Sequence, residues 1–176
     1  GNSVSNVREV ALYSEFAFEA AVIANNTVDG AAVGVSVCNF NEGGRIAVVQ
    51  GNIIRNLKPK RPIGTAPDDD AGIGIYVEAD SSVPGNVVEN APSFGIIAGW
   101  GKYLRDVAIT GNVIRNAFVG VGVSVLPGAG TASNLAFKFG NILDSFTLDI
   151  ALNDLETEGY GRVLSSPKIA TAASWS

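Results

Sequence analysis

The chain has 176 residues, of which 47% are hydrophobic and 16% charged, and its formal net charge is −5. This composition is typical of one domain with a sizeable core, and it argues against intrinsic disorder, which needs low hydrophobicity and high net charge. The acidic balance disfavours nucleic-acid partners, which require clustered Lys and Arg, and the single cysteine, Cys38, excludes an internal disulfide framework.

A short motif recurs along the chain and predicts the fold. It has the form G-N-x-apolar-x-N, it begins at residues 1, 25, 51, 85, 111 and 140, and successive copies therefore lie 24, 26, 34, 26 and 29 residues apart. In a parallel solenoid, equivalent residues of successive coils lie about 4.8 Å apart, so a column of amides can pass hydrogen bonds from rung to rung. The second motif position predicts such a ladder, with the members Asn2, Asn26, Asn52, Asn86, Asn112 and Asn141.

Two further motif positions form columns. The fourth position is always apolar and is expected to point into the core: Val4, Val28, Ile54, Val88, Ile114 and Leu143. The sixth position is asparagine at residues 6, 56, 90 and 116, and Gly30 and Ser145 interrupt it. The glycine that opens most copies supplies a backbone conformation that other residues rarely adopt.

Two more strands are expected in each rung. The second follows a small residue as an apolar-x-apolar pair: Val10/Leu12, Val35/Val37, Ile75/Val77, Ile96/Ala98, Val123/Val125 and Leu148/Ile150. The third precedes the next motif at residues 21–23, 46–48, 107–109 and 135–137. Period-two patterns of this kind indicate strands with one buried face.

The sequence therefore predicts an all-β protein, a right-handed parallel β-helix of about six rungs with three short strands per rung, in a single domain over residues 1–171. The alternative is an α/β domain, which needs amphipathic helices of about ten residues or more. Only residues 7–24 and 149–158 could compete as helices, and a short helix in the second segment is compatible with its pattern.

The strings GNIIRN, GNVVEN and GNVIRN carry a family resemblance. Residues 1–131 resemble the right-handed β-helix repeat proteins of alphaproteobacteria, a functionally uncharacterised family exported by the twin-arginine route, which implies a periplasmic parent. Residues 135–171, with GRVLSSPKIAT, are similar to part of the secretin domain of type IV pilus outer-membrane pores. Together these resemblances predict a chimera joined near residues 132–133, whose second part completes or caps the last rung or forms a separate hairpin.

The two ends of the chain add expectations about its origin and assembly. No signal peptide opens the sequence, and residues 172–176 resemble the start of a Strep-type tag, so the chain is expected to be recombinant. No apolar run reaches the roughly 18 residues of a membrane span. Because a β-helix has an unpaired edge at each end, we expect copies to associate as a homodimer or higher homo-oligomer.

The absence of histidine directs the search for chemistry to other residues. A Ser-His-Asp triad is excluded and zinc is disfavoured, so no metal site is predicted, although an oxygen-ligated calcium ion stays open. The long third rung holds its extra residues at 57–71, where Arg61 precedes Asp68, Asp69 and Asp70. These carboxylates are candidates for cation binding or acid–base catalysis; the alternative is a solvated charge run that closes the loop.

Other loops could reach the same flank as this one. They carry Glu78 and Asp80, and then Trp100, Lys102 and Tyr103, where an exposed aromatic ring could stack on a sugar. Trp100 could equally fold over the edge of the sheet. Carboxylates one and two rungs apart would be about 5 and about 10 Å apart, which brackets the separations of retaining and inverting glycosidases.

Three functions remain open on this basis. The first is a non-catalytic, self-associating scaffold. The second is a polysaccharide-binding protein, lyase or glycoside hydrolase with catalytic Asp68, Asp69, Asp70, Glu78 and Asp80 and substrate-binding Arg61, Trp100, Lys102 and Tyr103. The third is a secretin-like assembly element. The second reading draws on analogy between folds, which is a weak guide to function.

Overall fold

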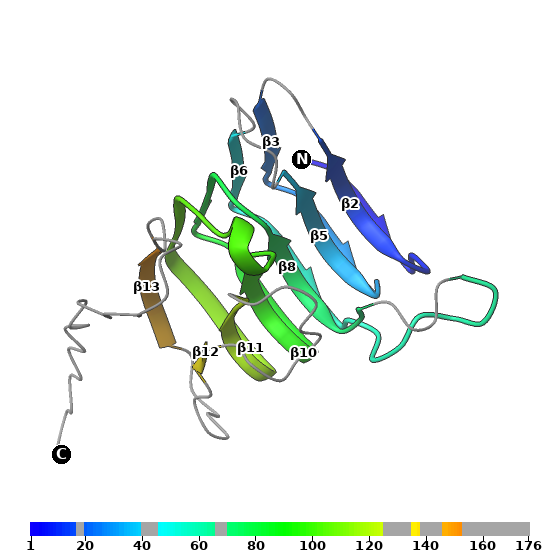
Figure 1. Cartoon of the computed structure of the whole chain (residues 1–176). Helices are drawn as coiled ribbons and strands as arrows, with labels where there is room; N and C mark the ends of the chain where they lie inside the picture. Colours follow the sequence, from blue (N-terminus) through cyan, green and yellow to red (C-terminus); the bar gives the residue numbers. More distant parts are fainter. Residues whose placement is uncertain (17–19, 40–45, 66–69, 125–134, 138–145, 153–176) are drawn as a thin grey trace, which may run out of the picture.

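The structure is a computed structural model, and it describes residues 1–16, 20–39, 46–65, 70–124, 135–137 and 146–152 (Figure 1). The described residues contain strands and one short 3-10 helix. In chain order these are β1 (Ser3–Ser5), β2 (Val10–Glu15), β3 (Ala20–Ala24), β4 (Thr27–Asp29), β5 (Val33–Cys38), β6 (Ile46–Gln50), β7 (Ile53–Arg55), β8 (Ile73–Val77), β9 (Ser81–Pro84), β10 (Val87–Ala98), η1 (Gly101–Tyr103), β11 (Val107–Val123), β12 (Leu135–Phe137) and β13 (Phe146–Leu152).

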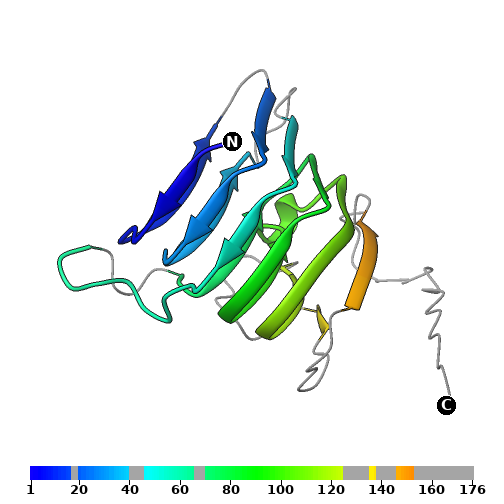
Figure 2. The ribbon, with the colours of Figure 1, turned by 180° about the vertical axis from the view of Figure 1, so that it is seen from behind.

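Three parallel ladders run along the molecule, and they confirm the predicted parallel β-helix (Figures 1 and 2). The first sheet is β1-β4-β7-β10-β11, the second is β2-β5-β8-β10-β11, and the third is β3-β6-β9-β11. β10 turns the corner from the first sheet to the second without a break, and β11 runs through the third, first and second sheets in turn.

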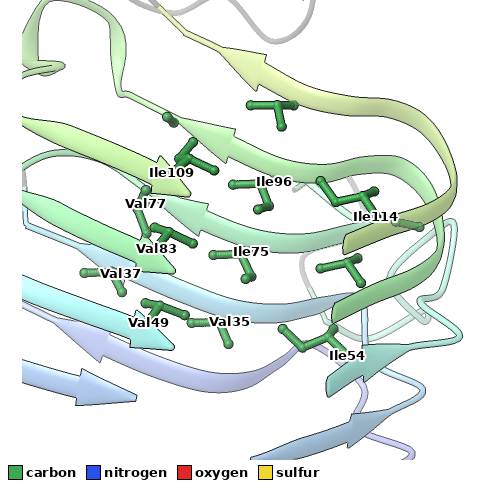
Figure 3. Packing of buried hydrophobic residues seen from close by; sticks show 14 of the residues in the cluster. Val35, Val37, Val49, Ile54, Ile75, Val77, Val83, Ile96, Ile109 and Ile114 are labelled. Atoms are coloured by element: carbon green, nitrogen blue, oxygen red, sulfur yellow. The ribbon is translucent and has the colours of Figure 1, made fainter. Parts of the chain in front are cut away.

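The core lies between the three sheets, as the motif predicts. Of the fourth-position residues, Val28, Ile54 and Val88 are fully buried, Ile114 is buried, and Val4 packs against the core from the first rung. Figure 3 shows Ile54 and Ile114 of this column together with Ile75 and Ile96 of the second sheet and Val83 and Ile109 of the third. Burial of aliphatic columns is the main favourable contribution to folding in such a coil.

The asparagine ladder forms over five rungs. In Asn2, Asn26, Asn52 and Asn86, the backbone N–H and the side-chain Nδ2 both donate to the Oδ1 of the asparagine in the next rung, at 2.8 to 3.0 Å, and Asn112 is the last acceptor among the described residues. Nδ2 also donates to the backbone of the rung before, as from Asn52 to the Ile23 oxygen at 2.9 Å. Asn52 and Asn86 are fully buried, so the ladder satisfies polar groups that water cannot reach. Asn141 lies outside the described residues.

The residues of the sixth-position column share an unusual backbone conformation. Asn6, Asn56, Asn90 and Asn116 all have φ between 50° and 58°, in the left-handed region. Gly30, which interrupts the asparagines in the sequence, has φ 82°, so the column is continuous in backbone conformation. Asparagine and glycine are the residues that adopt this conformation most readily.

A column of glycines lies at the start of the second sheet, one residue after its first paired position. Gly34, Gly74, Gly95 and Gly120 lie on successive rungs. A methyl group on Gly74 would overlap the carbonyl oxygen of Gly95 and lie 2.6 Å from Val88 Cγ1. These positions therefore need glycine for space. They are the small residues that precede the apolar-x-apolar pairs in the sequence, and the structure places Gly34 and Gly74 inside β5 and β8.

The register of the second sheet differs from the prediction at two rungs. In the first rung Leu12 and Ser14 pair with Val35 and Val37, where Val10 and Leu12 were expected. In the fifth rung Val121 and Val123 pair with Ile96 and Ala98, where Val123 and Val125 were expected. The corner between first and second strands differs in length from rung to rung, so counting from the motif misplaces the strand by two residues.

The last described strands reverse direction. β12 pairs antiparallel with the end of β11, and β13 pairs antiparallel with Val107–Ile114, so that Leu148 lies opposite Asn112 in the first sheet. The prediction that Leu148/Ile150 would continue the second sheet as a parallel sixth rung is wrong, and so is the placement of residues 135–137 in the third sheet. An edge strand needs N–H and C=O partners, and a strand of either direction supplies them. β13 thus covers one edge of β11.

The long third-rung loop folds back over the first two rungs. Lys58 Nζ donates to Asn6 Oδ1 at 3.1 Å and to the Val7 oxygen at 2.8 Å, and Arg8 donates to the Ile63 oxygen at 2.9 Å. Under the loop, Ala31 and Ala32 are fully buried. We call residues 57–65 the clasp loop.

Removing the Lys58 ammonium should loosen this clasp loop. We expect Lys58→Ala to lower the free energy of unfolding by about 1 to 2 kcal/mol, because hydrogen bonds from a charged donor are lost to two acceptors of the first rung. Amide hydrogen exchange should speed up at Ala31 and Ala32. Lys60→Ala is the matched control, since Lys60 is exposed in the same loop, and equal effects of the two changes would contradict this role.

Candidate functional site

Of the predicted site residues in the third-rung loop, Arg61 holds the loop in place within the fold. Arg61 Nη1 lies 3.2 Å from Glu9 Oε2, and Arg61 Nε donates to the Asp70 carbonyl oxygen at 3.1 Å. Asp70 itself is exposed at the start of the approach to β8. Asp68 and Asp69 lie outside the described residues. The arginine therefore ties the loop to the first rung.

Glu78 lies in a buried corner after β8. Glu78 is only 4% exposed, and its Oε2 accepts a hydrogen bond from the backbone N–H of Asn39 at 2.8 Å. Asn39 in turn exchanges hydrogen bonds with Ala79, donating to its oxygen at 2.6 Å and accepting from its N–H at 3.1 Å. Ser81 Oγ also donates to the Ala79 oxygen, at 2.6 Å. This network joins the corners of two rungs through a carboxylate.

Asp80 meets the aromatic loop at the same corner. Its carboxylate forms an ion pair with Arg105, and its backbone N–H donates to the Arg105 oxygen at 2.9 Å. Arg105 Nη1 donates to the Tyr103 oxygen at 3.3 Å. Trp100, immediately before η1, is 45% exposed, and Lys102 is the middle residue of η1. The structure thus brings Asp80, Tyr103 and the helix that follows Trp100 into one corner.

The two groups of predicted site residues lie at opposite ends of β8. Arg61 and Asp70 precede this strand and Glu78 and Asp80 follow it, so its five residues separate them by about 16 Å at roughly 3.3 Å per residue. Figure 1 shows the clasp loop at the start of β8 and η1 near the other end. The described residues therefore do not form one site on one flank, as the sequence led us to expect.

Sequence reasoning missed a polar cluster on the outward face of the second sheet. Tyr13, Ser36 and Tyr76 share one column, and the Tyr13 hydroxyl donates to Cys38 Sγ at 3.4 Å. Burial raises the pKa of the Cys38 thiol, which the hydrogen bond from Tyr13 partly offsets. Burial, and then the Glu78 and Asp70 carboxylates, raise the pKa of Tyr76. The correct register would have revealed this column, because it places Tyr13 opposite Ser36.

The thiol gives a pH-dependent test of this cluster. Because the Tyr13 hydrogen bond lowers the pKa of Cys38, we expect Tyr13→Phe to raise it further. The thiolate is the reactive form, so alkylation by iodoacetamide should need a higher pH in the variant than in the parent chain. Rates measured between pH 7 and 10 give the midpoint, and a midpoint that stays in place or falls would contradict the role of Tyr13.

The part of the chain that the structure describes holds no group of three or more His, Cys, Asp or Glu residues placed to bind a metal ion. Nor do those residues include a helix with the length and apolar character to span a bilayer.

Comparison with models of protein families, with curated proteins and with solved structures found no match to this chain.

Proposed function

We propose that this chain is a non-catalytic β-solenoid scaffold that associates with copies of itself. One observation supports the scaffold role: the polar side chains that could take part in catalysis instead hold different rungs of the coil together. Glu78 binds the backbone of Asn39, Asp80 pairs with Arg105, and Arg61 pairs with Glu9. A catalytic carboxylate needs an accessible reacting group beside it, whereas these side chains connect one coil to another.

Two measurements test this proposal. Light scattering coupled to size-exclusion chromatography should give a mass above 18.1 kDa that rises with protein concentration. Reducing-end and unsaturated-product assays against neutral and acidic polysaccharides should show no turnover. A strict monomer at high concentration would contradict self-association, and turnover that Asp80→Ala abolishes would contradict the scaffold role.

A second candidate is carbohydrate binding at the corner of η1. The observation that favours it is the partly exposed Trp100, which is close in sequence to Tyr103 and to Arg105, the partner of Asp80 in an ion pair. Aromatic faces beside charged and hydrogen-bonding groups are common features of ligand sites. A glycan array should then show binding that Trp100→Ala removes and Ile63→Ala retains, because Ile63 is 93% exposed but lies in the clasp loop. Equal binding by both variants would exclude this corner.

A further inference from the structure

The outward face of the first sheet carries a column of alternating charge. The fifth motif position holds Asp29, Arg55, Glu89 and Arg115 on four successive rungs, and the strand register places them directly side by side. Neighbours pair within the chain: Arg55 Nε lies 3.0 Å from Asp29 Oδ2, and Arg115 Nη2 lies 3.2 Å from Glu89 Oε1. The signs along the solenoid are therefore minus, plus, minus, plus.

A second column on the same face is mainly apolar. The third motif position holds Thr27, Ile53, Val87 and Val113 on the same four rungs. Ile53 is 47% exposed and lies at the middle of the face. An apolar column next to an ordered row of charges has the composition of an interface, because it offers area to bury and a pattern that selects the partner.

We propose that two copies of the chain pair through this face, about a two-fold axis that is parallel to the strands and passes between β7 and β10. Such an axis keeps each residue's position along the strand and reverses the order of the rungs. Asp29 then faces Arg115 of the partner subunit, and Arg55 faces Glu89 of the partner subunit. Ile53 faces Val87 of the partner subunit. This inference rests on the proposed self-association and names the surface that performs it.

The order of the charges selects this axis. An alternating row with an even number of members is complementary to its own reverse, which is the requirement of an isologous interface. A two-fold axis along the solenoid would instead keep each rung and reverse positions along the strand. Over the charged column it would set Arg55 against Arg55, and between the two columns it would set Arg55 against the apolar Ile53; like charges in contact and charges buried without partners are both unfavourable. The same residues thus favour one orientation and oppose the other.

The area of the face sets the expected strength. Four rungs at about 4.8 Å and strands of three residues give a small interface, well below the roughly 800 Å² per partner of a standard complex. We therefore expect a weak dimer. Its charged pairs should make it sensitive to salt, since screening shortens the range of electrostatic interactions from about 8 Å at 0.15 M to about 3 Å at 1 M ionic strength.

Charge reversal on two separate chains tests the proposal. In Arg55→Glu, the new carboxylate would face Glu89 of the partner subunit, and the dimer would contain two such repulsive pairs. In Glu89→Arg, the new guanidinium would face Arg55 of the partner subunit, again in two pairs. Each variant alone should dimerise at least tenfold more weakly than the parent chain in sedimentation equilibrium. An equimolar mixture of the two should recover dimers, because every facing pair is then opposite in charge.

The controls separate the surface from self-association itself. The double variant Arg55→Glu/Glu89→Arg stays complementary to its own reverse, so it should dimerise like the parent chain although its rows within the chain have changed. Lys60→Glu makes the same charge change in the clasp loop and should leave the dimer intact. Circular dichroism and thermal unfolding confirm that each variant is folded.

Three outcomes would overturn the inference. If the single variants dimerise normally, the chain associates through another surface, and the exposed Val22 and Ile46 of the third sheet are the next to change. If the mixture fails to recover dimers, the proposed facing pairs are wrong. If the parent chain is a monomer at all concentrations, both this surface and the proposed scaffold association fail.

Discussion

Replacing Gly74 with alanine is expected to lower the free energy of unfolding by about 3 kcal/mol or more, the upper part of the range for overpacked cores. The added methyl group would overlap the Gly95 oxygen and lie 2.6 Å from Val88 Cγ1. Neither neighbour can move easily, since Gly95 is hydrogen-bonded within the sheet and Val88 is fully buried. Urea unfolding followed by circular dichroism measures the change.

Gly85 provides a matched control, because its backbone conformation and not the space around it favours glycine. Its φ is +63°, but an added methyl group would meet nothing within 4 Å. Gly85→Ala should therefore cost only the strain of the left-handed conformation, about 1 to 2 kcal/mol. Gly85→Asn should cost less, because Asn25 holds the same motif position with φ 58°. If Gly74→Ala proved no more costly than Gly85→Ala, the packing around Gly74 would be looser than the structure shows.

Asn52→Ala is expected to have a comparable effect, of about 3 kcal/mol. The change removes the acceptor for two donors of Asn26 and the donor to Asn86 Oδ1 and the Ile23 oxygen. Asn52 is fully buried, so water cannot replace these partners, and each buried polar group left without a partner costs about 1 to 3 kcal/mol. Thermal and urea unfolding give the loss of stability.

Asn2→Ala is the control at the end of the ladder. Asn2 is exposed and its side chain donates one hydrogen bond, to Asn26 Oδ1 at 3.0 Å. Its removal should cost less than about 1 kcal/mol. If Asn2→Ala and Asn52→Ala had equal effects, burial would not be the reason for the ladder's importance.

Asn52→Asp adds a dependence on pH. The new carboxyl keeps the acceptor for Asn26 but would place its second oxygen beside Asn86 Oδ1, unless it is protonated and donates there. Burial and this acceptor should raise the pKa of the carboxyl in the folded chain above its usual value. The folded state then binds the extra proton, so the variant should lose stability relative to the parent chain as the pH rises.

The sequence predicts columns better than it predicts registers. The motif fixes the first sheet, because asparagine, the buried aliphatic residue and the left-handed asparagine or glycine recur at constant separations. The second strand is joined to the motif by a corner of variable length, so Val10 and Val125 were assigned positions that belong to Leu12 and Val123. The direction of β13 could not be predicted, since a strand of either direction satisfies the edge of β11.

The candidate site was less predictable than the fold. Charged residues in the third-rung loop have the same appearance whether they bind a ligand or another rung, and only the contact between Arg61 and Glu9, 52 residues apart, distinguishes the two. The alternation of Asp29, Arg55, Glu89 and Arg115 is visible in the sequence once the rungs are aligned. It becomes meaningful only when the register shows that the four side chains form one row.

The continuity of β10 and β11 has a consequence for how this coil can change length. β11 runs for 17 residues through all three sheets, with no loop at its corners. An inserted peptide there would shift every residue that follows out of alignment with the coil beneath. The corner between β7 and β8 instead carries the clasp loop and tolerates a longer connection. Peptide tags, or epitopes grafted for display, should therefore be accepted near Ile63 and rejected within residues 107–123.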